Sequence, residues 1–219
     1  QIGSKLGDIQ VDGRRVPAGA GALLAHVCLA AAEAGLAGLE FAYGIPGCVG
    51  GGVYMNAGAY GGEMKDILEN ATFFDDQLRE VTLSAADLHL GYRTSAFELM
   101  PWCILRASFL LEPGNADEIR ERMRDFAQRR VDKQPLDMPS AGSTFKRPKG
   151  AYAGALIDKC GLRGYAVGGA AISEKHCGFV VNLGGATCAD VLALCDEVRA
   201  IVKEKTGYDL EKEIRVVKA

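Results

Sequence analysis

The clearest pattern of apolar and polar positions lies near the C-terminus, between Thr187 and Gly207. Apolar side chains recur there at intervals of three and four residues, which places them on one face of an α-helix. Thr187 is suited to cap the start of this helix, with Asp190 three residues later, and Gly207 is suited to end it. The apolar positions are Val191, Leu194, Cys195, Val198, Ile201 and Val202. The pattern therefore predicts a long amphipathic helix.

Three other segments have helical patterns. An apolar stripe after Asn115, with Arg and Glu on the other faces, predicts a helix with a solvated charged side. This helix is expected to end before Gln134-Pro135, because the residue before a proline is disfavoured in the helical region. The stripe consists of Ile119, Met123, Phe126 and Ala127. Shorter helices are predicted from Leu23 to Ala31, with Gly35 as the C-cap, and from Ala155 to Lys159, ending at Gly161.

Extended stretches between these helices predict strands. They cover residues 9–11, 15–16, 71–74, 79–83, 102–111, 170–172, 178–183 and 213–218. The segment Glu112-Pro113-Gly114-Asn115 contains turn and breaker residues, and it is the predicted domain boundary. We therefore expect an α+β protein with two domains, residues 1–113 and residues 114–219.

Composition and charge narrow the class of protein. The chain has 219 residues, of which 48% are hydrophobic and 24% charged, so it has enough apolar material for real cores. The formal net charge is -3. A general nucleic-acid binder would carry a basic face, and this balance argues against one. A local basic pocket for a phosphorylated substrate remains open.

The cysteines and the hydropathy pattern indicate the compartment. Seven cysteines are scattered along the chain without a Cys-x-x-Cys pair, and most lie in apolar runs. We expect a reducing environment, no disulfide framework and no structural zinc site. No apolar stretch approaches the roughly 18 residues of a membrane span, and no secretory signal opens the chain. A cytoplasmic protein is the expectation.

Glycines are the most unusual feature of the composition. The chain has 28, and they cluster between Gly44 and Gly62. A single glycine is most often explained by a tight turn, but a run of them can bring backbone N–H groups close to an anion or a flat ring. The block has no Gly-Lys-Ser/Thr and lacks the spacing of a dinucleotide fingerprint. It is therefore interpreted as a ligand-contacting glycine loop.

Three further segments combine residues that suit catalysis with ordinary alternatives. Arg93, in Gly91–Phe97, is either a surface cation or a fork for a carboxylate or oxyanion. The segment 139–148 joins hydroxyls, glycine and two cations, which suits phosphate and proton-donor chemistry but also a plain turn. On an alternating strand Glu211, Glu213 and Arg215 would share one face, either as functional groups or as a solvated charge ladder.

The order of the motifs resembles one enzyme family over nearly the whole chain. The motifs are Gly-Ile-Pro-Gly-x-Val-Gly-Gly, Met-Asn-Ala-Gly-Ala-Tyr-Gly-Gly-Glu, Tyr-Arg-x-Ser-x-Phe, Ser-Ala-Gly-Ser-x-Phe-Lys-x-Pro, Gly-Gly-Ala-x-x-Ser-Glu-Lys-His and Leu-Glu-x-Glu-Ile-Arg. Together they resemble the UDP-N-acetylenolpyruvoylglucosamine reductases, also called UDP-N-acetylmuramate dehydrogenases. The Ser-Glu-Lys-His form and the short loop after the third motif resemble the compact second type of this family.

The resemblance implies a fold, two cofactors and a reaction. Residues 1–113 would form the second lobe of a vanillyl-alcohol-oxidase-type FAD-binding domain, and residues 114–219 a C-terminal substrate domain. In the family NADPH reduces FAD, and the reduced flavin passes hydride to the methylene carbon of UDP-N-acetylglucosamine enolpyruvate. The adjacent carbon then takes a proton, which yields UDP-N-acetylmuramate for bacterial peptidoglycan. No nucleic acid, membrane or metal is implied.

The resemblance also implies catalytic roles for three residues. Ser143 matches the proton donor of the family, and Arg93 matches the cation beside the enolate carboxylate. Glu213 matches a carboxyl group that polarises the same intermediate, and it is preferred over Glu211 because it directly precedes the apolar-Arg step of the motif. Glu213 must act as an acid or through a bridging donor, because a bare carboxylate would repel an enolate.

Binding residues follow from the motifs in the same way. The implied FAD contacts are Gly44, Ile45, Pro46, Gly47, Val49, Gly50, Gly51, Asn56, Ala57, Gly58, Ala59, Tyr60 and Gly61. The implied substrate contacts are Lys146, Arg147, Lys175 and Asn182. Arg147 occupies a position where the family has Asn, so the hydrogen bonding there departs from the pattern. For His176 a structural role is favoured over a ligand contact.

The start of the chain departs from the family pattern. Members carry an N-terminal lobe with a Gly-Ser-Asn loop for the FAD pyrophosphate, and nothing like that loop occurs here. We expect a fragment whose first lobe is missing and which by itself binds FAD weakly or not at all. Two alternatives are another flavin oxidase of the same superfamily and a catalytically silent module that binds a sugar nucleotide.

Overall fold

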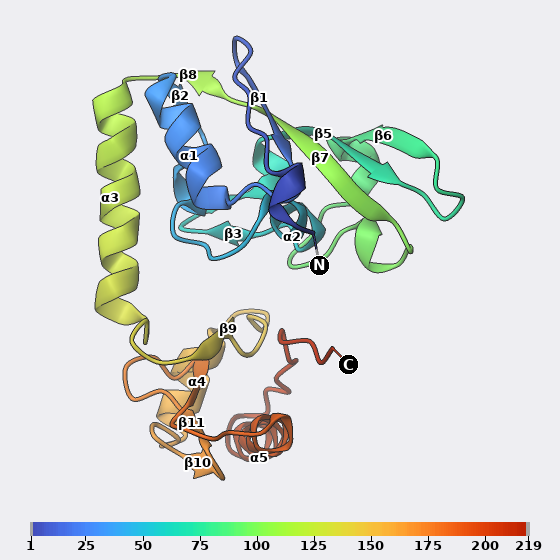
Figure 1. The fold of residues 1–219 in the computed structure, drawn as a ribbon. Coiled ribbons are helices and arrows are strands. Elements are labelled where there is room, and N and C mark those ends of the chain that lie inside the picture. The colour runs from blue at the N-terminus through green and yellow to red at the C-terminus, as the bar shows by residue number, and fades with distance from the viewer. Residues whose placement is uncertain (1, 218–219) are drawn as a thin grey trace. The chain divides into compact units, whose positions relative to one another are not determined.

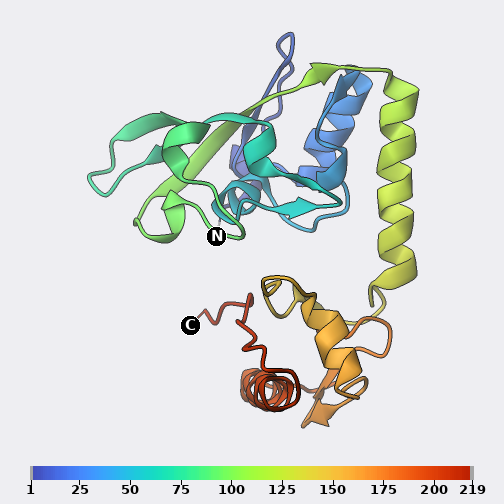
Figure 2. The same cartoon turned by 180° about the vertical axis from the view of Figure 1, so that it is seen from behind.

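The computed structural model describes residues 2–217, which divide into two compact units between Arg129 and Arg130. Each unit has its own cluster of buried apolar side chains. Figures 1 and 2 show the chain from opposite sides, and both units mix helices with antiparallel strands. The expected α+β class is confirmed.

Unit 1 is built on a four-stranded antiparallel sheet with the order β1-β7-β5-β6. The strands are β1 (Arg15–Gly19), β5 (Leu68–Phe74), β6 (Glu80–Ser84) and β7 (Cys103–Leu110). The strands predicted at 71–74, 79–83 and 102–111 correspond to β5, β6 and β7. Ala107 and Phe109 are buried at alternate positions of β7, as expected for a strand with one covered face. Ile104 is also buried, but it lies beyond a shift in the pairing with β5 that interrupts the alternation.

Helices and short hairpins complete unit 1. They are α1 (Leu24–Glu33), β2 (Leu36–Ala37), α2 (Val49–Tyr54), β3 (Gly58–Ala59), β4 (Gly62–Glu63), β8 (Glu112–Pro113) and most of α3 (Ala116–Lys133). Short 3-10 turns cover Ser4–Leu6, Glu40–Ala42, Met64–Asp66, Ala85–Leu88 and Ala96–Glu98. The predicted helix at 23–31 is α1, and Gly35 follows it with a left-handed φ of 67°.

Two expectations for unit 1 were wrong. The segment 9–11 forms no strand, and Ile9 makes only an isolated bridge to Ala18. Within the glycine block, Val49–Tyr54 is helical rather than a loop. The helix forms despite three glycines because Val49 and Val53 are fully buried. Tertiary packing therefore overrides the low helix propensity of glycine here.

Helix α3 begins at a side-chain cap and packs against unit 1. The Asn115 side chain accepts hydrogen bonds from the amides of Asp117 (2.9 Å) and Glu118 (3.2 Å). Ile119 and Met123 are buried in the core of unit 1, and α3 lies beside α1 in both overall views (Figures 1 and 2). The helix ends at Lys133, before Gln134-Pro135, as predicted. The predicted boundary lies at 113–114, before α3, whereas the division into compact units lies after residue 129, within α3. The domain boundary therefore stays a prediction.

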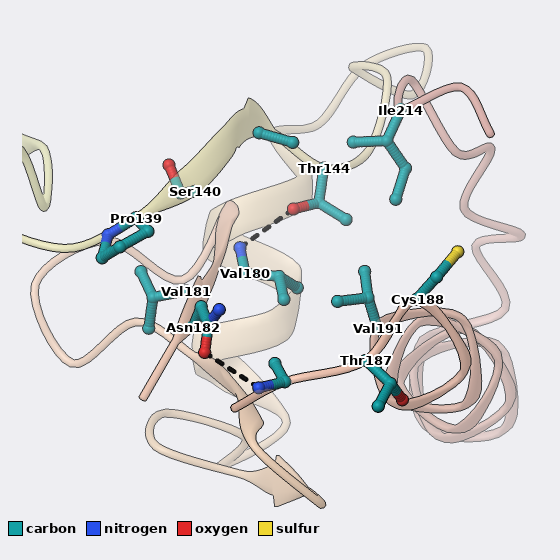
Figure 3. Close-up of a pocket in the computed structure, with 12 residues that line it drawn as sticks. Pro139, Ser140, Thr144, Val180, Val181, Asn182, Thr187, Cys188, Val191 and Ile214 are labelled. Atoms are coloured by element: carbon teal, nitrogen blue, oxygen red, sulfur yellow. Dashed lines mark hydrogen bonds between the residues drawn. The ribbon is translucent and has the colours of Figure 1, made fainter. Parts of the chain in front are cut away.

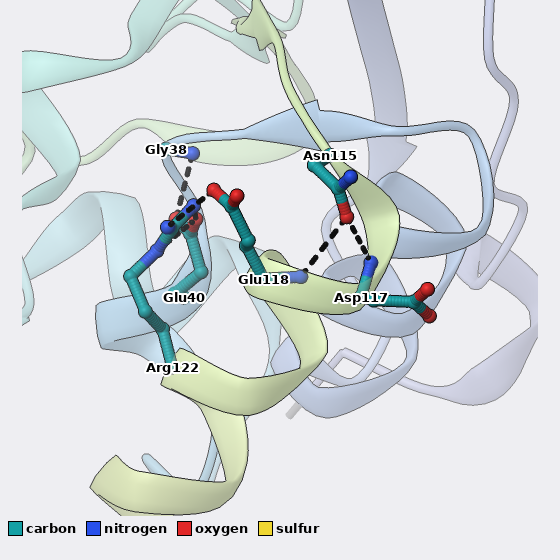
Figure 4. Close-up of polar contacts among 6 residues, drawn as sticks. All are labelled: Gly38, Glu40, Asn115, Asp117, Glu118 and Arg122. Carbon is teal, nitrogen blue, oxygen red and sulfur yellow. Dashed lines mark hydrogen bonds and ion pairs between the residues drawn. The ribbon is translucent and has the colours of Figure 1, made fainter.

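An ion pair fixes the first half of α3 to the turn after β2. Glu40 is buried, with only 8% of the residue exposed, and its carboxylate lies in the turn. It accepts hydrogen bonds from Gly38 N (2.7 Å) and from Nε and Nη2 of Arg122 (3.1 and 2.8 Å), as Figure 4 shows. A buried carboxylate needs such partners, because an uncompensated charge is costly to hold away from water.

Unit 2 is a smaller four-stranded sheet covered by two helices. Its order is β10-β11-β12-β9, and all neighbours are antiparallel. The elements are β9 (Ser140–Ser143), α4 (Ala153–Lys159), β10 (Ala166–Val167), β11 (Ala170–Ile172), β12 (Phe179–Asn182) and α5 (Cys188–Thr206). The predicted short helix is α4, and the strands predicted at 170–172 and 178–183 correspond to β11 and β12.

Helix α5 confirms the strongest sequence pattern. Thr187 Oγ1 accepts from Asp190 N (3.1 Å) while the Asp190 carboxylate accepts from Thr187 N (2.8 Å), which is a capping box. Gly207 ends the helix with φ 78°. Leu194 and Val198 are fully buried. No helix within residues 2–217 is both long enough and apolar enough to cross a membrane.

The closing strand predicted at 213–218 is not present. Lys212 forms an isolated bridge to Phe145, and residues 213–217 form no strand. Residue 218 lies outside the described residues. The sequence alternates as a strand would, but the bridge at Lys212 is not followed by further pairs up to residue 217.

The seven cysteines are all free thiols in very different surroundings. Cys103 in unit 1 and Cys188 in unit 2 are exposed. Burial raises the pKa of the Cys28 thiol to about 12, and the same cause raises the pKa of Cys195 to about 11. The buried thiols therefore behave as small apolar core groups.

Removing the Arg122 guanidinium should expose the cost of burying Glu40. We expect Arg122→Ala to lower the free energy of unfolding by about 1–3 kcal/mol, because Glu40 loses a charged partner. The matched control is Arg120→Ala on the same helix, whose ion pair with Asp117 is exposed and should contribute less than about 1 kcal/mol. Urea denaturation measures both, and equal losses would contradict the role given to Glu40.

Candidate functional site

The predicted site residues fall into two groups, one in each unit, and each is described by itself. In unit 1 the glycine block leaves part of its backbone open. Gly44 (φ 87°) and Gly47 (φ 142°) are exposed and adopt backbone conformations that favour glycine. Gly51 is exposed, lies in α2 without a positive φ, and has no neighbour within 4 Å of an added Cβ. Neither its conformation nor packing against the described residues requires glycine at Gly51, so a ligand that approached here would meet no side chain.

Other parts of the same block serve the fold. A Cβ on Gly50 would lie 3.1 Å from the Ala20 side chain, and one on Gly52 would lie 3.3 Å from Met64. The first amides of α2 are also used internally, since Val49 N and Gly50 N donate to the carbonyls of Ala22 and Ala20 at 2.9 Å. These two amides are therefore already engaged in hydrogen bonds within the chain.

Asn56 links the glycine block to two other segments. Its side chain is fully buried, with Nδ2 donating to Glu63 Oε2 and to the Gly91 carbonyl, both at 2.8 Å. Its Oδ1 accepts from Lys65 N at 2.9 Å. Three satisfied hydrogen bonds fix the orientation of this buried amide.

Arg93 lies against the β3–β4 hairpin, although the two are far apart in sequence. Its Nη2 donates to the Gly58 carbonyl at 2.9 Å, and its guanidinium lies 4.9 Å from the centre of the Tyr92 ring. Two residues later, Ser95 Oγ donates to the Tyr54 carbonyl at 2.7 Å. The structure thus places the Tyr-Arg-x-Ser segment beside the glycine block and holds the cation there.

Strained backbone is concentrated in this region. Among the described residues, five non-glycine residues have a positive φ. Three of them are predicted site residues: Asn56 (φ 41°), Tyr60 (φ 52°) and Arg93 (φ 55°). Left-handed conformations at such residues persist only where the surroundings enforce them, and they cluster at functional sites. The observation therefore favours a site along this edge of unit 1.

In unit 2, backbone hydrogen bonds join the Ser-Ala-Gly-Ser segment to the C-terminal motif. Glu213 N donates to the Thr144 carbonyl and Lys146 N to the Glu211 carbonyl, each at 2.8 Å. Ser143 precedes this pairing at the exposed end of β9, where it lies opposite Phe179. Ser143 and Glu213 therefore come from neighbouring stretches of backbone.

The side chains of the C-terminal motif are not equivalent. Glu211 Oε1 accepts from Lys146 Nζ at 2.7 Å, so its charge is already paired. Lys146 is the more covered partner, with 25% side-chain exposure against 70% for Glu211. Glu213 is half-buried. Glu211 is thus the more exposed of the two glutamates and is paired with Lys146.

The remaining predicted substrate contacts are spread over unit 2. Lys175 Nζ donates to the Val131 carbonyl at the end of α3 (2.5 Å). The Arg147 guanidinium lies 3.8 Å from the centre of the Tyr152 ring. Asn182 Oδ1 accepts from Gly184 N (2.8 Å) and Ala186 N (3.1 Å). Each of these three side chains thus contacts a different partner within the chain.

A pocket of about 300 Å³ opens between the sheet of unit 2 and the start of α5 (Figure 3). Asn182 lies in its wall, and Thr144 and Ile214, which directly follow Ser143 and Glu213, also line it. The other lining residues are Pro139, Ser140, Ala141, Val180, Val181, Ala186, Thr187, Cys188 and Val191. Sequence reasoning missed most of them, because apolar residues that line a pocket have the same pattern as core residues.

His176 is fixed inside its own loop, in agreement with the structural role favoured for it. Its Nδ1 accepts from Gly178 N at 3.0 Å, and its ring packs edge-to-face on Phe179 with centres 5.1 Å apart. Burial lowers the pKa of His176, and the positive charges of Arg163 and Lys133 act in the same direction.

Comparison with known proteins gives two family matches in this chain. Residues 4–84 match an FAD binding domain. Residues 134–217 match the C-terminal domain of UDP-N-acetylenolpyruvoylglucosamine reductase. The two matches fall in different units, on the glycine block and on the Ser143–Glu213 segment pair respectively.

Individual relatives carry the same name. The UDP-N-acetylenolpyruvoylglucosamine reductase of Caldanaerobacter subterraneus subsp. tengcongensis is 49% identical over 214 residues, which cover 98% of this chain and 71% of the relative. That of Lachnoclostridium phytofermentans is 51% identical over 206 residues, covering 94% and 66%. The chain thus spans about two thirds of the length of these relatives. The crystal structure of UDP-N-acetylenolpyruvylglucosamine reductase from Thermus caldophilus aligns with a TM-score of 0.83 at 38% identity, covering 96% of this chain and 74% of that one.

The lowered pKa of His176 predicts a pH dependence of stability. The unfolded chain, with a His pKa of about 6.5, takes up a proton first as the pH falls. The free energy of unfolding should therefore decrease as the pH drops from about 6.5 toward the folded pKa of His176. Replacing His176→Asn should remove this part of the decrease. NMR titration of the His176 ring protons checks the cause directly, and a pKa at or above the ordinary value would refute it.

Proposed function

Because this chain belongs to the UDP-N-acetylenolpyruvoylglucosamine reductase family, we propose that it serves the reduction of UDP-N-acetylglucosamine enolpyruvate to UDP-N-acetylmuramate. NADPH is the reductant, FAD the mediator and the bacterial cytoplasm the place of this peptidoglycan step. The observation that best supports the proposal is the open glycine backbone of unit 1, with Arg93 fixed beside it. The chain spans about two thirds of its relatives' length, so the activity of the whole protein is part of the proposal.

The glycine block fits a flat cofactor. At Gly44, Gly47 and Gly51 the backbone is exposed and carries no side chain that would keep a ring away. When bound, FAD supplies the hydride that originates from NADPH. The chain's task is to hold that ring against its backbone. The proposed contacts are Gly44, Ile45, Pro46, Gly47, Val49, Gly50, Gly51, Asn56, Ala57, Gly58, Ala59, Tyr60 and Gly61.

Arg93 is the proposed partner of the substrate carboxylate. Hydride addition to the enolpyruvyl group leaves negative charge on the carbon next to the carboxylate, and the charge spreads onto that carboxylate. A guanidinium held in place stabilises it without reorganising during the reaction. The hydrogen bond from Arg93 to the Gly58 carbonyl supports this role, because it fixes the cation at the hairpin.

Ser143 is the proposed proton donor. Its hydroxyl is exposed at the end of β9, where a substrate can reach it. The carbanionic carbon takes the hydroxyl proton, and the serine oxygen must then regain a proton from its surroundings. The paired backbone next to Ser143, anchored by Glu213 N on the Thr144 carbonyl, limits the positions this hydroxyl can take.

Glu213 is the proposed carboxyl group that assists the same step, as an acid or through a bridging donor. Glu211 is the alternative by sequence, and it is exposed, whereas Glu213 is half-buried. Lys146, Arg147, Lys175 and Asn182 are proposed as contacts for the sugar nucleotide. Lys146 and Lys175 would each exchange a present partner, Glu211 or the Val131 carbonyl, for a substrate oxygen.

The proposal predicts that Ser143 and Arg93 matter in one half-reaction only. In the FAD-loaded protein, Ser143→Ala should slow flavin reoxidation by substrate at least about 100-fold, because the proton donor is lost. Reduction of the flavin by NADPH should remain near the parent rate, and Arg93→Ala should show the same asymmetry. Stopped-flow absorbance separates the halves, with Ser84→Ala, an exposed serine elsewhere, as the control. Equal slowing of both half-reactions would mean that Ser143 is structural.

Gly51 predicts a separation of stability from cofactor affinity. Gly51→Ala should leave the free energy of unfolding unchanged or raise it by up to about 1 kcal/mol, since alanine is the better helix former. FAD should bind at least about tenfold more weakly, because the added methyl occupies the space for the ring. Gly3→Ala, at another open position without positive φ, is the matched control. Unchanged FAD affinity in fluorescence titrations would place the cofactor elsewhere.

A further inference from the structure

We propose that Phe126 of α3 is a positioning residue that holds the β3–β4 turn in the shape required by the flavin site. The inference rests on the proposed function and extends it to a residue outside every recognised motif. Tyr60, Phe126 and Arg129 are called the aromatic clamp below. The ring of Tyr60 stacks on that of Phe126, with centres 4.6 Å apart and planes 6° from parallel.

The β3–β4 hairpin needs external support. Each strand has two residues, Gly58–Ala59 and Gly62–Glu63, and a hairpin this short is not stable in isolation. Both turn residues, Tyr60 (φ 52°) and Gly61 (φ 91°), are left-handed. Glycine adopts this conformation freely, but tyrosine does so only at an energetic cost. Contacts of the Tyr60 side chain must therefore help to hold the turn.

Base and tip of the hairpin are held by different elements. At the base, Arg93 Nη2 donates to the Gly58 carbonyl and Asn56 Nδ2 to the Glu63 carboxylate. At the tip, Phe126 covers one face of the Tyr60 ring. Offset or stacked aromatic pairs add to ordinary apolar burial, so the tip gains a specific orientation as well as contact area.

Phe126 is itself presented by a rigid support. It follows the buried residues Ile119 and Met123 on the same face of α3. Arg129 is oriented by an ion pair with Asp125 (2.7 Å), and its guanidinium lies 5.9 Å from the Tyr60 ring centre and 5.6 Å from that of Phe126. The clamp therefore fixes the turn to a helix that is already anchored to the core.

The aromatic clamp bears on FAD binding because the β3–β4 hairpin contains proposed FAD contacts. Gly58, Ala59, Tyr60 and Gly61 are four of the proposed FAD contacts. A mobile turn must become ordered when FAD binds, and the entropy lost in ordering it lowers the affinity for FAD. A turn that is already ordered avoids this entropy loss. Phe126 would thus raise FAD affinity without contacting FAD.

Hydrogen exchange on the cofactor-free protein tests the clamp itself. Phe126→Ala should raise amide exchange in residues 58–63 by about tenfold or more, while β5 keeps the parent rate. Phe126→Tyr retains the ring and should restore the parent pattern. Phe74→Ala, which removes a half-exposed aromatic side chain on β5, is the matched control and should leave 58–63 unchanged. Unchanged exchange at 58–63 in Phe126→Ala would overturn the proposal.

FAD titration then tests the consequence. Phe126→Ala should bind FAD about tenfold more weakly than the parent, with Phe126→Tyr close to the parent. Faster exchange at 58–63 combined with parent FAD affinity would overturn the positioning role. Failure of the parent protein to bind FAD would overturn the effect of Phe126 on affinity but not the proposed function, because this chain by itself is expected to bind FAD weakly, and the exchange data would still decide whether Phe126 orders the turn.

Discussion

The buried amide of Asn56 is the interaction on which the candidate site of unit 1 depends. Its three hydrogen bonds connect the end of the glycine block, the β3–β4 hairpin and the Gly91 turn that leads into Arg93. A buried amide that loses one partner leaves a polar group unsatisfied, which is energetically costly. Displacing any one of the three segments is therefore unfavourable. The left-handed backbone at Asn56 and Arg93 is the conformational cost of this arrangement.

In unit 2, backbone hydrogen bonds rather than a buried side chain join segments that are far apart in the sequence. Two amide-to-carbonyl hydrogen bonds, from Glu213 to Thr144 and from Lys146 to Glu211, bring the C-terminal segment to the end of β9. This short pairing delivers Glu213 beside the strand that presents Ser143, and it engages Glu211 with Lys146 at the same time. One register thus distinguishes two glutamates that look alike in the sequence.

The parts of the fold that were predictable have local causes. Helix α5 could be read from its period, its Thr187–Asp190 capping box and Gly207, and the end of α3 from Gln134-Pro135. Helix α2 could not, because its glycines disfavour a helix and only contacts with distant core residues form it. Residues 213–217 alternate like a strand, but the only bridge that the described residues form nearby is at Lys212. An alternating pattern indicates which face of a strand could be buried, but it does not show whether a neighbouring strand is there to pair with it.

The candidate site shows the same division. The motif order identified the family, and the glycine block predicted a ligand site. The partners of single side chains depend on the tertiary fold, so neither the stack of Tyr60 on Phe126 nor the ion pair of Lys146 with Glu211 was visible in the sequence. Phe126 belonged to an apolar stripe that predicts burial, and its partner lies in a segment with no apolar period at all.

The distribution of thiols makes the two units separately addressable. Cys103 and Cys188 are exposed, one in each unit, whereas the Cys28 and Cys195 thiols are buried and have raised pKa values. Maleimide dyes or spin labels react with accessible thiolates, so mild conditions favour the two surface positions. With the half-exposed Cys48 replaced by serine, the native cysteines offer one exposed labelling position in each unit.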